Sequence, residues 1–165
     1  MIERGEFAEL HCLSNYSFLR GASHPEELVY KASDLGYSAI AITDECSYSG
    51  LVKAHVAAKQ CGIKLIVGAE FFVDMTHGEE KNSVENIIML APTRQAYGQL
   101  SAFISKIRRK NQKGNSYLGY EDCQIGLSDC LILWSPELQD IDIQVSVGHK
   151  LKTIFQHFWI TLELF

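Results

Sequence analysis

The chain has 165 residues, of which 47% are hydrophobic and 21% charged, a composition typical of a globular domain that can bury one core. Its net charge of -5 leaves no chain-wide electrostatic footprint for nucleic acid, and no apolar run reaches the roughly 20 residues of a membrane span. The five cysteines are scattered without a C-x-x-C pair, which favours a reduced compartment over a disulfide framework. We therefore expect a cytoplasmic, single-domain protein without membrane contact.

In the first half of the chain, short apolar runs alternate with amphipathic stretches. The apolar runs predict strands over residues 7–13, 38–43 and 63–67, the last continuing through 71–73 after a kink at 68–70. The amphipathic stretches predict two helices, over residues 23–35 and 50–60. Ser23 and Ser49 are the predicted N-caps of these helices, and Gly36 and Gly62 are their stop signals.

The same alternation continues in the second half. It predicts strands over residues 86–91, 130–134 and 158–164, and helices capped by Thr93 up to about Arg109 and within 136–156. Residues 75–84 and 111–126 are expected to be irregular, the second with one short helical turn. Strands separated by helices predict βαβ units with right-handed crossovers. Six strands fall short of the roughly eight of a closed barrel, so we expect an incomplete barrel from a truncated gene product or fragment.

Ionisable side chains follow three of the predicted strands. These side chains are His11, Asp44, Glu45 and Glu70. The C-terminal ends of parallel strands meet on one face, where α/β enzymes build their active sites. Imidazole and carboxylates together form a ligand set for divalent metal ions, so the sequence predicts a metal site at this face.

Four ordered motifs carry a resemblance to a known family. They lie in residues 7–23, 41–45, 66–71 and 89–100. The chain resembles the polymerase and histidinol phosphatase (PHP) domain at the N-terminus of bacterial C-family DNA polymerases, which include the alpha subunit of polymerase III. Two motifs look like the error-prone, DNA-damage-inducible branch of that family: His11-Cys12-Leu13-Ser14-Asn15 and Asp44-Glu45-Cys46.

The resemblance implies an α/β fold, a distorted PHP-type β/α barrel of about seven units, of which residues 1–165 would supply about six. It implies a parent DNA-directed DNA polymerase, a nucleotidyltransferase that uses Mg and acts in DNA replication, DNA repair and damage-induced translesion synthesis. The palm, fingers and thumb of that polymerase are absent from these residues. Complete family members hold a metal cluster at the strand ends and hydrolyse phosphoesters, and some polymerase members proofread with this domain.

The family's ligand pattern is only partly present. Leu13 and Asn86 stand where the resemblance implies histidine ligands, and Glu45 replaces a third histidine, whereas His11 and Glu70 match. We therefore expect a degenerate metal site, a remnant formed by His11, Asp44, Glu45 and Glu70. No tightly bound cofactor is expected, and one weak Zn or Mn ion is left open. Asp44 has an alternative role as a turn or helix cap before residues 47–49.

One basic cluster stands out in the second half of the chain. It comprises Lys106, Arg108, Arg109 and Lys110, followed by Lys113. Cations at the C-terminus of a helix complement the helix dipole, which gives the cluster a structural interpretation. The alternative is a contact with DNA or with another polymerase domain.

The favoured function is that of a mainly structural PHP domain that braces the core of an error-prone DNA polymerase, with DNA and the rest of the polymerase chain as partners. The first alternative is a metal-dependent phosphoesterase or a 3′-5′ exonuclease that proofreads. The second is a stand-alone module that binds polymerase accessory proteins.

Overall fold

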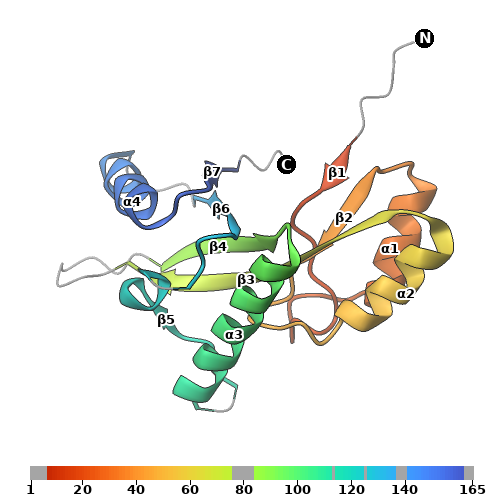
Figure 1. Cartoon of the computed structure of the whole chain (residues 1–165), viewed down its shortest axis with the longest axis horizontal. Helices are drawn as coiled ribbons and strands as arrows, with labels where there is room; N and C mark the ends of the chain where they lie inside the picture. Colours follow the sequence, from red (N-terminus) through yellow and green to blue (C-terminus); the bar gives the residue numbers. More distant parts are fainter. Residues whose placement is uncertain (1–6, 76–83, 113, 125, 137–140, 162–165) are drawn as a thin grey trace, which may run out of the picture. The chain divides into compact units, whose positions relative to one another are not determined.

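The computed structural model describes residues 7–75, 84–112, 114–124, 126–136 and 141–161 (Figure 1). Two compact units divide the chain, Met1–Ala69 and Glu70–Phe165. The strand β3 (Lys64–Asp74) begins in the first unit and ends in the second. Within the described parts, no helix is long and apolar enough to cross a membrane.

The first unit contains the parallel strands at one edge of the sheet, together with two helices. Strands β1 (Ala8–Glu9), β2 (Ala39–Ile42) and the first part of β3 pair in that order, with Ala8 opposite Ala39 and Ala39 opposite Lys64. Helices α1 (Pro25–Asp34) and α2 (Leu51–Cys61) connect these strands and lie side by side (Figure 1). The predicted parallel βαβ arrangement is confirmed for this unit.

Small and branched side chains form the core of the first unit. The fully buried members are Val29 and Ala32 of α1, Ile40 and Ile42 of β2, and Ala54, Ala57 and Ala58 of α2. Three alanines on one face of α2 let this helix approach α1 closely, and each buried Val or Ile contributes about 1.5–3 kcal/mol of transfer free energy. This packing holds the C-terminal end of β2 in place.

The helix starts in the first unit differ from the predicted ones by one residue. His24, not Ser23, is the N-cap of α1, and its backbone N–H donates to the Glu27 carboxylate at 2.8 Å. Gly50, not Ser49, is the N-cap of α2. The predicted stop of α2 is confirmed, because Gly62 adopts a φ of 77°, a left-handed conformation that glycine allows without strain.

The second unit contains the end of β3 and four further strands. β4 (Val84–Ala91), β6 (Leu131–Ser135) and β7 (Phe158–Ile160) follow β3 in the sheet, and the short β5 (Leu118–Gly119) pairs with β3 in parallel. The helices are α3 (Arg94–Lys110), the 3₁₀ turn η1 (Tyr120–Gln124) and α4 (Ile141–Ile154).

Helix α3 packs against β4 (Figure 1). Its buried residues are spaced at helical intervals: Ala96, Leu100, Phe103 and Ile107. The rings of Phe71 and Phe103 meet edge to face with centroids 5.3 Å apart. The predicted Thr93 cap is confirmed, since its hydroxyl accepts from the backbone N–H of Ala96 at 3.1 Å.

Three features of the second unit differ from the sequence predictions. β4 and β6 pair antiparallel, with Ile87 opposite Trp134, whereas βαβ units would place them in parallel. β3 runs as one strand through residues 68–70, where a kink was predicted, and β5 forms in a segment that was expected to be irregular apart from one short helical turn. β7 ends at Ile160, and residues 162–164 of the predicted strand 158–164 lie outside the described residues. The α/β class itself is confirmed.

Candidate functional site

Asp44, one of the predicted metal-site residues, is held by hydrogen bonds from the loop that follows β1. It lies two residues beyond β2 and is 1% exposed. Its Oδ1 accepts from the backbone N–H of Ser14 at 2.8 Å and from the Ser17 hydroxyl at 2.7 Å. Its Oδ2 accepts from the Ser14 hydroxyl at 2.7 Å. Three short, charge-assisted hydrogen bonds therefore commit this carboxylate to the loop that follows β1.

The two neighbours of Asp44 bind the same loop segment. The Thr43 hydroxyl accepts from the backbone N–H of Cys12 at 3.0 Å. The backbone N–H of Glu45 donates to the Ser17 hydroxyl at 3.0 Å, and the Glu45 carboxylate forms an ion pair with Arg20 at 3.5 Å. Three successive residues after β2 thus anchor residues 12–20, and we call this arrangement the loop clamp (Thr43, Asp44, Glu45 with Ser14, Ser17 and Arg20).

Two glycines make room for the loop clamp. A β-carbon on Gly21 would lie 1.9 Å from the carbonyl oxygen of Ser14, which is a backbone clash that no rotamer change relieves. A β-carbon on Gly50 would lie 3.0 Å from Oδ2 of Asp44 and 2.8 Å from Cγ of Pro25. The predicted use of Asp44 as a side-chain cap for residues 47–49 is wrong. Its backbone carbonyl accepts from Ser47, but its carboxylate binds the opposite loop.

His11 lies between β1 and the clamped segment, and Leu13 lies at the start of that segment. Both are half-buried, and the backbone N–H of His11 donates to the Glu9 carboxylate at 3.0 Å. Leu13 offers no donor atom to a metal ion. Between them, burial raises the pKa of the Cys12 thiol to about 11, with the charges of Glu9 and Asp44 acting in the same direction.

The other two predicted site positions lie in the second unit. Glu70 of β3 is fully buried, and the side-chain amide of Asn86 on β4 donates to its Oε2 at 3.2 Å. The Asn86 Oδ1 atom is buried, and no described residue donates a hydrogen bond to it. The amide thus fills a position at which the resemblance implies an imidazole ligand.

The side chains at these positions differ from the histidine-rich ligand set that the resemblance implies. Among the residues that the structure describes, no group of three or more His, Cys, Asp or Glu side chains could hold a metal ion. The carboxylates of Asp44 and Glu45 are bound by serines and by an arginine, and Leu13 supplies no ligand. Sequence reasoning missed Ser14, Ser17 and Gly21, although the serine-rich segment after the first strand was a visible signal for side-chain-to-backbone bonding.

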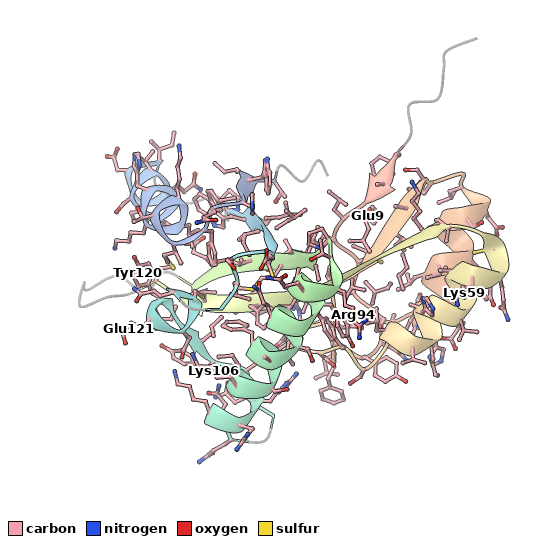
Figure 2. The ribbon with its side chains drawn as sticks, viewed as in Figure 1. Glu9, Lys59, Arg94, Lys106, Tyr120 and Glu121 are labelled. Carbon is pink, nitrogen blue, oxygen red and sulfur yellow. The ribbon has the colours of Figure 1, made fainter. Side chains whose placement is uncertain are left out.

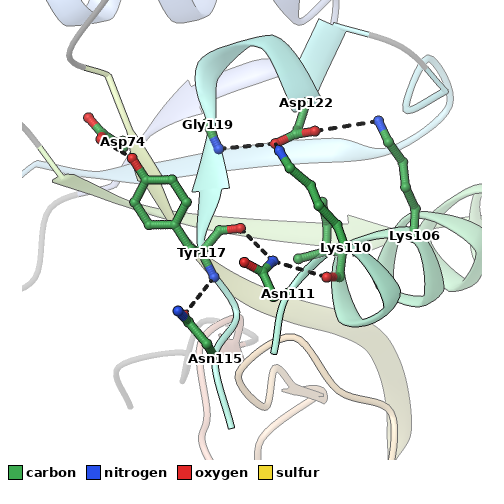
Figure 3. A network of polar contacts seen from close by, with 9 residues as sticks. Asp74, Lys106, Lys110, Asn111, Asn115, Tyr117, Gly119 and Asp122 are labelled. Atoms are coloured by element: carbon green, nitrogen blue, oxygen red, sulfur yellow. Dashed lines mark hydrogen bonds and ion pairs between the residues drawn. The ribbon is translucent and has the colours of Figure 1, made fainter. Parts of the chain in front are cut away.

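The predicted basic cluster lies at the C-terminal end of α3, next to η1. Lys106 and Lys110 form ion pairs with Asp122 at 3.7 Å and 2.5 Å (Figure 3). Figure 2 shows Lys106 on the side of α3 that faces the turn bearing Tyr120 and Glu121. Burial acts to raise the pKa of Asp122, but the hydrogen bonds from Lys110 and the Gly119 N–H and the two lysine charges lower it overall. Two cations of the cluster therefore hold η1 against α3.

A second set of contacts fastens the segment before η1 (Figure 3). The side-chain amide of Asn111 donates to the carbonyls of Ile107 at 3.0 Å and Tyr117 at 2.8 Å. The Tyr117 hydroxyl donates to the Asp74 carboxylate, and this bond raises the pKa of the exposed phenol. The Tyr117–Asp74 bond joins the segment before β5 to the end of β3, so these polar contacts help explain how β5 reaches β3 without a predicted strand signal.

The class of the domain follows from its fold. An amidohydrolase from Chromobacterium violaceum superposes with a TM-score of 0.67 at 16% identity, covering 92% of this chain and 75% of that one. A protein from Bifidobacterium adolescentis assigned as a metal-dependent phosphoesterase gives a TM-score of 0.61 at 12% identity, covering 88% and 75%. At these identities the likeness shows the fold alone, an α/β fold of the kind found in PHP-like phosphoesterases.

The family is shown by the sequence itself. Residues 9–142 match the PHP domain, and this chain belongs to the PHP domain family. It is 47% identical over 158 residues to an error-prone DNA polymerase from Idiomarina loihiensis, covering 95% of this chain and 14% of that polymerase. It is 46% identical to an error-prone DNA polymerase from Saccharophagus degradans, again covering 14% of the relative. The resemblance to the error-prone branch is confirmed.

Proposed function

We propose that this chain serves as the PHP part of an error-prone DNA polymerase and that its role there is structural. The observation that carries the proposal is the loop clamp, in which Asp44 and Glu45 bind Ser14, Ser17 and Arg20. The Asp44 carboxylate already accepts three hydrogen bonds at 2.7–2.8 Å, so three of its roughly four lone-pair sites are used within the loop. We infer that the polar groups at this end of β2 stabilise the domain, which in turn braces the polymerase core.

The wider setting rests on the relatives. The chain spans about 14% of the length of the error-prone DNA polymerases that it matches, so nucleotidyl transfer with Mg belongs to the remainder of such a polymerase. On this proposal the parent polymerase replicates and repairs damaged DNA in the cytoplasm, with DNA and the rest of its own chain as partners. Accessory proteins of the polymerase are further proposed partners.

The basic cluster is proposed to act inside the domain rather than on DNA. Lys106 and Lys110 are paired with Asp122, which neutralises part of the charge that a phosphate contact needs. Arg109→Ala should therefore leave the salt dependence of DNA binding by the parent polymerase unchanged. A reduction of the salt slope by about one unit would assign Arg109 to a phosphate contact instead.

The structural role can be tested in a chimeric polymerase in which this chain replaces the matching segment of the Idiomarina loihiensis enzyme. Asp44→Ala should lower the melting temperature and the heat resistance of primer extension, whereas Asp34→Ala, at an exposed position of α1, should change neither. Treatment with a chelator should leave the melting temperature of the unsubstituted chimera unchanged. A chelator-induced drop as large as that caused by Asp44→Ala would show that a metal ion, not the clamp, stabilises the domain.

A metal-dependent phosphoesterase or proofreading 3′-5′ exonuclease is the second candidate function. The observation in its favour is the buried pair in the second unit, where Glu70 matches a family ligand and Asn86 Oδ1 has no hydrogen-bond donor among the described residues. Hydrolysis of a generic phosphodiester with added Mn, lost in Glu70→Gln, would support it. Equal background rates for the chain and for Glu70→Gln would exclude it.

A further inference from the structure

The loop between β1 and α1 exposes two adjacent apolar side chains at its tip. Phe18 is 84% exposed and Leu19 is 89% exposed, next to Tyr16 at 40%. Leu19 has a φ of 61°, a left-handed conformation that is uncommon for a residue with a branched side chain. Single exposed apolar residues are ordinary, but two exposed neighbours, one of them held in a disfavoured backbone conformation, need a cause.

The loop is ordered by bonds at its base, not by burial of its tip. Besides the loop clamp, the backbone N–H groups of Arg20 and Gly21 both donate to the carbonyl of Ser17 at 3.0 Å. The backbone N–H of Asn15 donates to the carbonyl of Ser23 at 2.8 Å and closes the loop. These bonds restrict the loop before any partner arrives, which lowers the entropy cost of binding.

The charges next to the tip are compensated. Arg20 is paired with the Glu45 carboxylate at 3.5 Å. Lys53 is paired with Glu26 at 3.7 Å and lies over the Tyr16 ring, 5.9 Å from its centroid. Nucleic acid and anionic membranes are recognised by cations that neutralise phosphates. The cations near this tip are already paired, and the exposed side chains of Phe18 and Leu19 are apolar. Such a tip instead fits an apolar pocket on a protein.

We propose that Phe18 and Leu19 dock into an apolar pocket on another domain of the same polymerase chain. The proposal rests on the proposed function, because it takes the chain to be one part of a longer polymerase. The relatives support this choice of partner, since their matched segment is about 14% of their length and the remainder is covalently attached to it. Attachment gives a small apolar contact a high effective concentration, so two side chains suffice for docking.

Asp44 and Glu45 acquire a specific role in this arrangement. They stand at the motif positions that the family uses beside its metal site, and in this chain they fix the base of the docking loop. They are positioning residues, because they act on Phe18 and Leu19 through Ser17 and Arg20. Asp44→Ala should therefore weaken the docking without touching the partner surface.

Site-specific photo-crosslinking tests the proposal in the full-length chimera with the Idiomarina loihiensis polymerase. Phe18, which is 84% exposed, is replaced by p-benzoylphenylalanine, and the matched control carries the same group at Val52 on α2, which is 74% exposed. After irradiation with primer-template DNA present, we expect several-fold more intramolecular cross-link from position 18 than from position 52. Mass spectrometry should map the linked peptide to apolar residues outside this chain's 165 positions.

Each of the other outcomes overturns the docking proposal. Cross-links from position 18 to DNA or to a second polymerase molecule would name a different partner. A yield equal to that of the Val52 control would show that the tip has no partner. These failures are distinct from failure of the structural role, which would appear as an unchanged melting temperature of Asp44→Ala even where the intramolecular cross-link forms.

Discussion

Replacing Asp44 by alanine removes the acceptor of three hydrogen bonds from a site that is 1% exposed. A hydrogen bond to a charged group contributes about 1.5–3 kcal/mol, and a buried donor left unpaired costs about 1–3 kcal/mol. The hydroxyls of Ser14 and Ser17 can rotate toward other acceptors, whereas the backbone N–H of Ser14 cannot. We therefore expect a loss of about 3–5 kcal/mol in the free energy of unfolding, well below the sum of three full bonds.

Asp44→Asn provides a graded comparison. Its remaining oxygen can still accept from the Ser14 N–H and the Ser17 hydroxyl, so we expect a loss of only about 1–2 kcal/mol. Urea unfolding followed by circular dichroism measures both losses, with the exposed Asp34→Ala as a control expected within about 0.5 kcal/mol of the unsubstituted chain. Equal stabilities of Asp44→Ala and Asp34→Ala would refute the loop clamp as the element that holds this part of the fold.

Three further predictions concern other parts of the chain. Gly21→Ala should unfold the first unit at lower urea concentration, because its methyl group would lie 1.9 Å from the carbonyl oxygen of Ser14. Burial raises the pKa of the Cys123 thiol from 9.0 to about 12, so the unfolded thiol ionises first and the free energy of unfolding should fall as pH rises from about 9 to 12. The 165-residue chain alone should self-associate through the edge of β7, where Trp159 is 50% exposed and Ile160 is 58% exposed. Analytical ultracentrifugation would detect this self-association.

Matched variants decide each of these predictions. Gly98→Ala places its methyl group in open space on α3 and should cost nothing, so an equal loss in both glycine variants would contradict the steric argument. Cys123→Ala should flatten the alkaline decline, and an unaltered slope would assign the decline to other groups. Ile160→Lys should suppress the self-association of β7, and a monodisperse monomer of the unsubstituted chain would contradict the open-edge argument.

Local signals predicted the helices well. The Thr93 cap and the apolar spacing from Ala96 to Ile107 fixed α3 almost to the residue, because capping and helical periodicity are properties of neighbouring residues. The antiparallel pairing of β4 with β6 was not predictable in the same way. An apolar run has the same pattern whichever direction its partner runs, and the partner of Ile87 is Trp134, far away in the chain.

The candidate site shows the same limit for side chains. Asp44 was correctly singled out as a polar residue at the end of a buried strand, but a metal ligand and a hydrogen-bond acceptor have the same local sequence. Its role depends on Ser14 and Ser17, which are 30 and 27 residues away. The absence of a donor at Leu13 was visible in the sequence, whereas the use of the remaining carboxylates by serines and an arginine required the structure.

The metal content of the purified protein tests the central claim most directly. After dialysis against a weak chelator, elemental analysis of the chain, alone and within the chimeric polymerase, should find well under one Zn or Mn ion per molecule. The physical reason is that Leu13 supplies no ligand and that the carboxylates of Asp44 and Glu45 are already bound within the loop clamp. Two or more retained ions per molecule would contradict the account and would restore a metal centre to this domain.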